Sequence, residues 1–524
     1  MSKQEEFDRR SFVTGALGAA AGIGVSALLN KKVEAQQGPG GGGGGAPQIP
    51  PEMRRQQSLY RLEADVRDCE VTGKIPSDLN GAFYRVGPDA QYPLDARDIP
   101  FDGEGHVSMF RIKDGRAHYR SRMVRNERYM AQDKAGKRLF HLYRNPAFDD
   151  PSVKGLSRST ANTHIMNHKN YLLALKEDSP PTAMDLLTLD TVVPNYTFDD
   201  QLPSKTFTAH PKIDSETGNL VAFGYEADGF GSDVVSMFEI TPQGKVVWNA
   251  KIKVPYVGML HDFAVTQKHI VFYVIPFAID PEQMKGGGVH WSWDPARPTY
   301  FGFVRRGGDG KDIQWIKGPT RSATHVMGTF DDGNKLHIDV EMSMSNPFPF
   351  FPMRAGSKWD PISGSSHITR LSVDLSKKRP SSYGIEQLYP HVGALPRQDD
   401  RYNTMPYRYG FLPCPDPNAA PGTGGACYAR FDHQTRKSTL FNAGTETSLA
   451  ECCFAPKNAN APEGTGYLMG LATRNNEAGR GDLVILDAEH LADGPIATVH
   501  LPMRAVGQIH GWWVPEDRLP AGPA

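Results

Sequence analysis

Short runs in which apolar and polar side chains alternate recur along most of the chain. Segments 107–112 (VSMFRI) and 117–120 (AHYR) flank Asp114-Gly115, a pattern that is typical of a β-hairpin. Segments 237–240 and 245–248 flank a Pro-Gln-Gly turn in the same way, and segments 326–328 and 336–338 flank Asp-Asp-Gly-Asn. Long helical periodicity is scarce, so the pattern predicts an all-β protein built from many short strands.

So many short strands in a chain of 524 residues favour radial repetition, because a β-propeller leaves few sheet edges exposed. No repeat of fixed period is visible, so the pattern alone does not set a number of blades. Two packed β-sandwiches are the structural alternative.

The N-terminal segment differs in composition from the rest. Residues 8–13 (DRRSFV) resemble a twin-arginine export motif, and small apolar residues fill positions 14–29 before Val33-Glu34-Ala35. We expect a signal peptide over 1–35 that is cut after Ala35, export to the periplasm by the twin-arginine machinery, and a Gly/Pro-rich linker over 36–55. An uncut N-terminal anchor is the alternative. The propeller domain is expected over 56–524.

Composition narrows the range of partners. With 58 basic and 59 acidic residues the net charge is -1, so we expect no nucleic-acid partner. The five cysteines are too few and too irregularly spaced for a disulfide scaffold or a zinc site. Pairing of Cys414 with Cys427 in an oxidising compartment stays open, as does the oligomeric state.

Four of the 17 histidines share a setting, a close approach of small or apolar residues beside a strand-like run. They are His210 (TAHP), His261 (MLHDF), His325 (ATHV) and His510 (QIHGW). Their wide spacing matches no local metal motif. On a propeller, however, inner strands of different blades can direct side chains at one central axis.

These contexts, in this order, resemble the carotenoid cleavage oxygenase superfamily, as do segments 81–88 (GAFYRVGP) and 101–106 (FDGEGH). The resemblance extends from about residue 58 to 516. It implies a seven-bladed β-propeller with a cap of loops and short helices. It also implies one Fe²⁺ per chain, held by His210, His261, His325 and His510, and dioxygen as co-substrate. Imidazole ligands suit iron(II).

The family holds three of its four ligand histidines with glutamates. Glu177 and Glu451 match two of these positions, but the third, in a Glu-(Phe/Leu)-Pro-Arg pattern, is Ala394 here. The partner of His325 is therefore open between water, a backbone carbonyl and another side chain. Loss of such a partner typically lowers metal affinity or activity about 10–100-fold.

Two residues resemble the lignostilbene-α,β-dioxygenase-like branch of the family. Tyr143 and Lys176 match the pair that hydrogen-bonds the 4-hydroxyl of a stilbene in that branch. A desolvated ammonium beside a phenol favours the phenolate and so activates the conjugated alkene. By the same resemblance, Phe101 and Phe348 surround the substrate rings and Thr163 lies beside an open metal position.

The sequence thus predicts a non-haem iron(II) dioxygenase that cleaves the central C=C bond of phenolic stilbenes or related aryl alkenes into two aldehydes. One alternative is a carotenoid or apocarotenoid cleavage dioxygenase, for which segment 346–353 (NPFPFFPM) would be a membrane-binding patch rather than the roof of the site. Another is a non-catalytic periplasmic propeller that binds ligands. A calcium-dependent lactonase would need converging carboxylates in place of histidines.

Overall fold

The computed structural model describes residues 60–420 and 423–521 of the chain. The expected signal peptide over 1–35 and linker over 36–55 lie outside the described residues. Within them, no helix combines the length and the apolar character needed to cross a bilayer.

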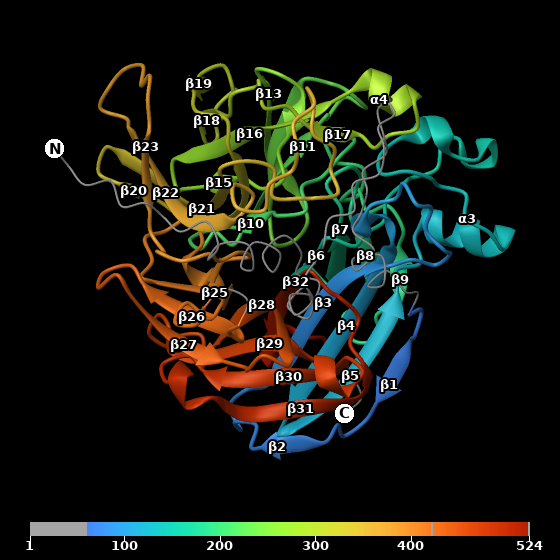
Figure 1. Cartoon of the computed structure of the whole chain (residues 1–524), viewed down its shortest axis with the longest axis vertical. Coiled ribbons are helices and arrows are strands. Elements are labelled where there is room, and N and C mark those ends of the chain that lie inside the picture. Colours follow the sequence, from blue (N-terminus) through green and yellow to red (C-terminus); the bar gives the residue numbers. More distant parts are fainter. Residues whose placement is uncertain (1–59, 421–422, 522–524) are drawn as a thin grey trace.

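Seven antiparallel sheets lie around a common centre (Figure 1). This arrangement confirms the β-propeller and the seven blades that the family resemblance implies, and the alternative of two packed sandwiches is wrong. One sheet joins the two ends of the chain: β1 (Ala64–Val66), β5 (Arg116–Met123), β4 (Glu104–Lys113), β3 (Gly81–Asp89) and β32 (His510–Pro515). The pairing of β3 with β32 closes the ring.

Three sheets follow along the chain. They are β6 (His164–His168), β7 (Tyr171–Leu175), β8 (Thr182–Met184) and β9 (Thr191–Val193); β10 (Lys212–Ile213), β11 (Leu220–Tyr225), β12 (Val234–Ile240) and β13 (Val246–Lys253); and β14 (Gly258–Met259), β16 (His269–Ile279), β18 (Tyr300–Arg305) and β19 (Gln314–Lys317), where β15 (Ala264–Val265) and β17 (Trp291–Trp293) pair with β16.

The remaining three sheets complete the ring. They are β20 (Ser322–Asp332), β21 (Lys335–Ser343), β22 (Ser366–Asp374) and β23 (Gly384–Gln387); β24 (Arg397–Gln398), β25 (Tyr409–Pro415), β26 (Ala426–Asp432) and β27 (Lys437–Asn442); and β28 (Thr447–Pro456), β29 (Gly466–Arg474), β30 (Arg480–Asp487), β31 (Pro495–Arg504) and β2 (Val71–Gly73). In the last of these, an N-terminal strand completes a C-terminal sheet.

The predicted hairpins are confirmed. Strands β4 and β5 pair across a turn in which Asp114 and Gly115 both have positive φ, of 51° and 74°. Such a turn matches the twist of the flanking strands, which is why Asp-Gly is a strong hairpin signal. Hairpins β12–β13 and β20–β21 also form where the Gly-containing turns predicted them.

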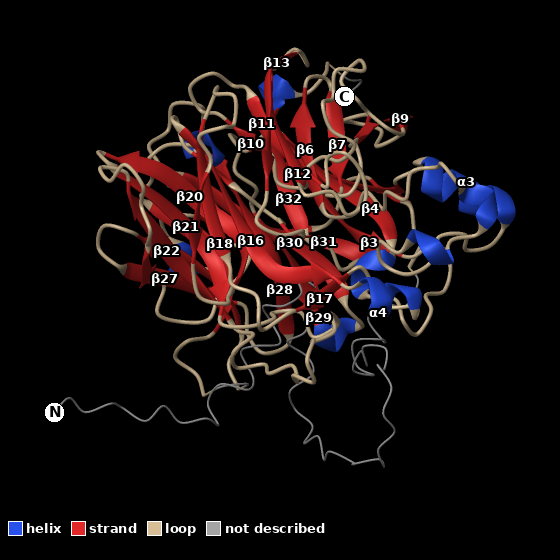
Figure 2. Ribbon diagram, turned by 90° about the horizontal axis from the view of Figure 1, so that it is seen from above, coloured by secondary structure: helices blue, strands red, loops and turns tan. Residues whose placement is uncertain are grey.

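Helices are few and short in the described part of the chain. Its two α-helices, α3 (Glu127–Ala135) and α4 (Pro281–Lys285), lie on the same side of the propeller (Figure 2). The 3₁₀ turns are η2 (Pro100–Asp102), η3 (Pro146–Phe148), η4 (Pro151–Val153), η5 (Asp400–Tyr402), η6 (Asn475–Glu477), η7 (Leu491–Asp493) and η8 (Glu516–Arg518).

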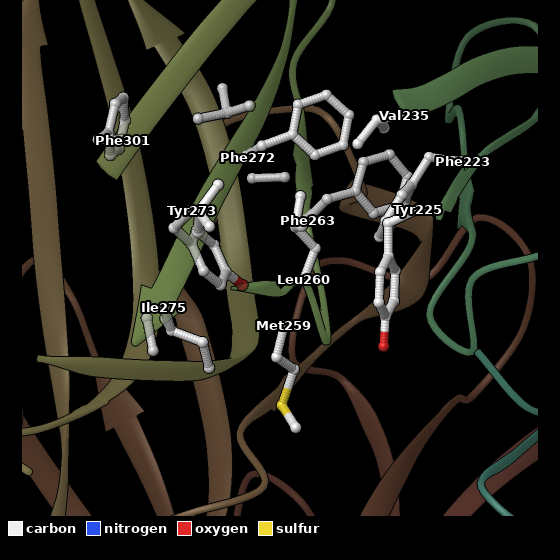
Figure 3. Packing of buried hydrophobic residues seen from close by; sticks show 14 of the residues in the cluster. Phe223, Tyr225, Val235, Met259, Leu260, Phe263, Phe272, Tyr273, Ile275 and Phe301 are labelled. Carbon is white, nitrogen blue, oxygen red and sulfur yellow. The ribbon is translucent and has the colours of Figure 1, made fainter. Parts of the chain in front are cut away.

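Apolar side chains fill the space between neighbouring blades. Between the β10–β13 and β14–β19 sheets, the ring of Phe223 lies 4.7 Å from that of Phe263 and 5.3 Å from that of Phe272. In Figure 3 the side chains of Tyr225 and Met259 extend away from these rings. Both reach the functional site described below, so the core fixes the site's walls.

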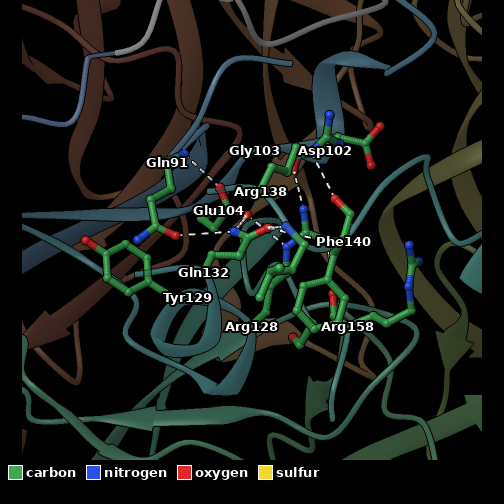
Figure 4. A network of polar contacts seen from close by, with 12 residues as sticks. Gln91, Asp102, Gly103, Glu104, Arg128, Tyr129, Gln132, Arg138, Phe140 and Arg158 are labelled. Atoms are coloured by element: carbon green, nitrogen blue, oxygen red, sulfur yellow. Dashed lines mark hydrogen bonds and ion pairs between the residues drawn. The ribbon is translucent and has the colours of Figure 1, made fainter. Parts of the chain in front are cut away.

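A buried polar network fastens α3 to the propeller (Figure 4). The carboxylate of Glu104, at the start of β4, accepts hydrogen bonds from Arg128 Nε at 2.8 Å and Gln132 Nε2 at 2.9 Å. Arg128 also donates to the carbonyl of Asp102 at 3.1 Å. The network therefore sets the position of η2, which carries Phe101.

The structure also answers whether Cys414 and Cys427 are bonded to each other. Cys414 and Cys427 are direct partners in the register of β25 and β26, and all five cysteines are buried free thiols.

The buried pair Arg128–Glu104 gives a stability prediction. We expect Arg128→Ala to lower the free energy of unfolding by about 3–5 kcal/mol, because it leaves the buried Glu104 charge unpaired. Lys251→Ala, which breaks an exposed pair with Asp228, should cost at most about 1 kcal/mol. Chemical denaturation of the three proteins measures this, and equal costs for the two variants would contradict the role of the network.

Candidate metal centre and substrate cavity

The four predicted histidines come together on the propeller axis. His210 precedes β10, His261 lies between β14 and β15, His325 is in β20, and His510 begins β32. Four different blades thus each contribute one imidazole. One ring nitrogen of each lies within 4.8 Å of those of the other three.

β-Bulges on the inner strands direct side chains at this centre. In β20 the register shifts between Ala323 and Val326, so that two residues of β20, including His325, face the single residue Glu341 of β21. A similar shift in β28 lies at Glu451. A bulge re-aims side chains in this way, and bulges are frequent beside active sites.

Three of the four imidazoles each hydrogen-bond a buried glutamate through Nδ1. The Nδ1–Oε distances are 2.8 Å for His261–Glu177, 2.7 Å for His325–Glu341 and 2.9 Å for His510–Glu451. Because Nδ1 is occupied, Nε2 is the atom free to face the centre. Nε2 of His510 is buried there without a hydrogen-bond partner among the described residues.

The expected hydrogen bonds of Glu177 and Glu451 to histidines of the cluster form. The structure also identifies the partner of His325. Its partner is another side chain, Glu341, which sequence reasoning missed. The same oxygen of Glu341 accepts a hydrogen bond from the backbone N–H of Leu395 at 3.0 Å. Glu341 therefore lies beside the segment in which Ala394 replaces the family's glutamate.

Cationic neighbours keep Glu177 ionised. Burial acts to raise its pKa, but the hydrogen bond from His261 and the charges of Lys176 and Arg144 prevail and lower the pKa to about 2. Tyr225 also donates a hydrogen bond of 2.9 Å to this carboxylate. The glutamate thus stays a hydrogen-bond acceptor for His261 throughout the physiological pH range.

Two of the imidazoles, those of His210 and His510, are shifted toward the neutral form that metal ligation requires. Burial, followed by the neighbouring histidines, lowers the pKa of His210 well below its ordinary value. Burial also lowers the pKa of His510 to about 4, despite the opposing charge of Glu451.

The donor set fits a divalent transition metal. The Nε2 atom of His261 lies 3.2 Å from that of His210 and 3.1 Å from that of His325. Metal–imidazole bonds of about 2.1 Å at right angles put neighbouring nitrogens about 3 Å apart. Imidazole suits iron, zinc, copper and nickel ions, whereas calcium and magnesium prefer oxygen.

An aromatic cavity adjoins the histidines, and every predicted pocket residue lines it. These are Phe101, Tyr143, Thr163, Lys176 and Phe348. The cavity is completed by Glu177, Met259, His261, His325, Glu341, Pro347, Phe351, Leu395, Ile509 and His510. Three residues of segment 346–353 line it, in agreement with the expectation that this segment roofs the site.

Lys176 and Tyr143 form a polar pair in these apolar surroundings. Lys176 Nζ donates to Tyr143 Oη at 3.3 Å, and both side chains are buried, at 5% and 4% exposure. Burial, followed by the charge of Glu177, raises the pKa of Tyr143 well above its ordinary value, so the tyrosine stays a neutral phenol. Leu142 and Arg144, on either side, have left-handed φ angles of 53° and 51°. Such strain concentrates at functional sites.

A side-chain amide links two of the predicted pocket residues. Asn162 Nδ2 donates to the carbonyl of Phe101 at 2.9 Å, and Thr163 Oγ1 donates to Asn162 Oδ1 at 3.1 Å. The ring of Phe101 meets that of Phe348 edge to face at 6.2 Å. Phe101 is thus fixed to the segment that leads into β6.

A fifth histidine near the centre was not predicted. His164, at the start of β6, is buried with its ring 5.4 Å from that of His210 and 5.3 Å from that of His510. It lines a second, polar cavity with Lys212 and Arg397. Its context (NTHI) also has a threonine directly before the histidine, as in the ATHV context of His325, so the local pattern alone does not separate this histidine from the other four.

The fold and the site together define the class of this protein. It is a β-propeller with a candidate metal centre of four histidines on its axis, next to an aromatic cavity. The family described as Retinal pigment epithelial membrane protein matches residues 58–515. The chain therefore belongs to this family, the carotenoid cleavage oxygenases, as the motifs predicted.

Among curated relatives, lignostilbene-α,β-dioxygenase isozyme III of Sphingomonas paucimobilis is 40% identical over 473 residues, which cover 88% of this chain and 96% of the relative. Isoeugenol monooxygenase of Pseudomonas putida is 36% identical, with coverage of 86% and 95%. The crystal structure of Pseudomonas brassicacearum lignostilbene dioxygenase superposes with a TM-score of 0.83 at 38% identity, covering 87% of this chain and 97% of that chain.

The convergence of four imidazoles gives a prediction for metal binding. After incubation with iron(II), we expect His261→Ala to retain much less metal than the parent, because His261 contacts two other histidines of the cluster through Nε2. His168→Gln, at a buried histidine that instead bonds the carbonyl of Thr241, should keep it. Elemental analysis after gel filtration measures both, and full retention by His261→Ala would remove His261 from the ligand set.

Proposed function

We propose that this chain is an iron(II)-dependent dioxygenase that cleaves the central C=C bond of phenolic stilbenes or related aryl alkenes into two aldehydes. The observation that carries the proposal is the Lys176–Tyr143 pair, which lines the same aromatic cavity as His261, His325 and His510. Relatives named for lignostilbene and isoeugenol, both aryl alkenes, support it.

The polar pair suits a phenolic substrate. A buried ammonium needs an acceptor, and the hydroxyl of a bound 4-hydroxystilbene would supply a second one beside Tyr143. The positive charge of Lys176 favours the phenolate, whose electron density extends through the ring into the alkene. A carotenoid hydrocarbon chain has no group to satisfy Lys176, which is why we prefer the aryl alkene.

The aromatic walls would bind and orient the substrate. Phe101, Phe348 and Phe351 line the cavity, and rings of a flat stilbene gain stabilisation from edge and face contacts with them. Thr163 lines the same cavity, and by the family resemblance it would lie beside an open position of the metal.

His210, His261, His325 and His510 would hold the iron, with Glu177, Glu341 and Glu451 orienting three of them. Iron(II) bound there would supply the activation of dioxygen. The overall reaction is balanced: one alkene and one O₂ give two aldehydes, with one oxygen atom on each former alkene carbon.

The experiment is a product assay with isotope labelling. Iron-loaded protein receives a 4-hydroxystilbene under ¹⁸O₂, and the products are reduced at once to alcohols, which prevents oxygen exchange with water. We expect two aromatic alcohols in equal amounts, each carrying the label. Label in one product only would indicate a monooxygenase. No cleavage by an iron-replete sample would contradict the proposal, and apocarotenoid substrates would then be assayed.

Lys176 gives a specific prediction. We expect Lys176→Met to lower kcat/KM for a 4-hydroxystilbene about 100-fold, the lower range of proton-transfer contributions in enzymes. Turnover of the 4-methoxy analogue, which has no proton to lose, should change little. Lys251→Met, at an exposed lysine, is the matched control. Equal turnover of the phenolic substrate by variant and parent, at equal iron content, would rule out the phenolate role.

A further inference from the structure

We propose that Glu341 is a positioning residue of the metal centre that substitutes, from a different strand, for the glutamate missing at Ala394. Its carboxylate orients His325 and at the same time holds the segment 394–396 against the site. This inference rests on the proposed iron-dependent function, because its measurable consequence is the affinity for iron.

The hairpin geometry explains how Glu341 reaches His325. The residues are neighbours across the β20–β21 pair of one blade, and the bulge in β20 brings His325 opposite Glu341. The Nδ1–Oε2 distance is 2.7 Å, and the Glu341 side chain is 4% exposed. Glu177 and Glu451, by contrast, lie on different blades from His261 and His510. Glu341 is therefore a support built into the blade of its own histidine.

The segment around Ala394 depends on the same carboxylate. The Leu395 N–H donates to Glu341 Oε2 at 3.0 Å, and Leu395 has a left-handed φ of 48°. That conformation costs a non-glycine residue free energy, which this hydrogen bond helps to offset. Ala394, which precedes Leu395, is itself buried, with 3% exposure.

Glutamates at both positions would work against each other. A carboxylate at 394 would bring a second negative charge to a buried imidazole that has one Nδ1 proton to donate, and two close carboxylates do not both ionise readily. The two positions are therefore alternatives. The glutamate at 341 thus compensates for the alanine at 394.

Of the three glutamates, Glu341 is the one whose removal disturbs the fewest other charged groups. Glu177 lies 3.8 Å from Arg144 Nη1, and Glu451 lies 3.5 Å from Arg397 Nη1. The ion pairs of the described residues give Glu341 one partner, His325. Removing it leaves no buried arginine unpaired, and the groups that lose a hydrogen-bond partner include His325 and the Leu395 N–H.

The experiment measures iron affinity by chelator competition in the parent, Glu341→Ala, Glu341→Met and the double variant Glu341→Ala/Ala394→Glu. We expect Glu341→Ala to weaken iron binding about 10–100-fold, and the double variant to regain most of that loss. Glu386→Ala, at an exposed glutamate of β23 in the same blade, is the control and should bind like the parent.

The possible outcomes separate the role of Glu341, its compensation for Ala394 and the proposed function. Parent affinity in Glu341→Ala, or in Glu341→Met if the alanine variant does not fold, would overturn the role of Glu341 alone. A loss that Ala394→Glu does not restore would overturn the compensation between the two positions. A parent that fails to bind iron would overturn the proposed function itself, which separates the two failures.

Discussion

The hydrogen bonds between buried glutamates and imidazoles are the interactions on which the rest of the site depends. An imidazole on a propeller axis can rotate, and without a fixed Nδ1 partner its Nε2 atom has no defined direction. Glu177, Glu341 and Glu451 remove that freedom for three of the four histidines. Because carboxylates are acceptors, they also fix the tautomer that leaves Nε2 free to bind a metal.

Placing ionised carboxylates at the centre of a protein requires compensation, and the compensation connects the metal centre to the substrate cavity. Lys176 and Glu177 are successive residues just beyond β7. Lys176 contacts Tyr143 in the cavity, and Glu177 contacts His261 of the histidine cluster. The positive charge that would bind the phenol also lowers the pKa of the glutamate that supports the metal ligand.

Much of this arrangement was predictable from sequence, for identifiable reasons. The Asp-Gly turn at Asp114 needs two residues with positive φ, so the hairpin was fixed locally. The four histidine contexts and the Lys176–Glu177 dipeptide are short motifs, and family resemblance gave them roles. The number of blades was predicted from that resemblance alone. The inner strands range from two residues in β10 to 11 in β20, so the sequence shows no regular repeat from which blades could be counted.

Glu341 could not be predicted in this way. In β21, Leu336, Ile338 and Val340 alternate with polar residues, a pattern typical of a strand with one face in water. Both faces are covered in the folded blade, where Glu341 is 3% exposed. The pairing with His325 further depends on a bulge in the neighbouring strand, which the sequence does not mark. A long-range contact thus decides the role of a residue whose local pattern suggests an ordinary surface position.

The central claim is that four imidazoles from four blades bind one iron. Iron K-edge X-ray absorption of the loaded protein tests it most directly, together with elemental analysis of the same sample. We predict one iron per chain, with imidazole nitrogen scatterers at about 2.1 Å and no sulfur scatterer. Iron bound through sulfur, with fewer than three imidazoles, or not retained at all would contradict the account.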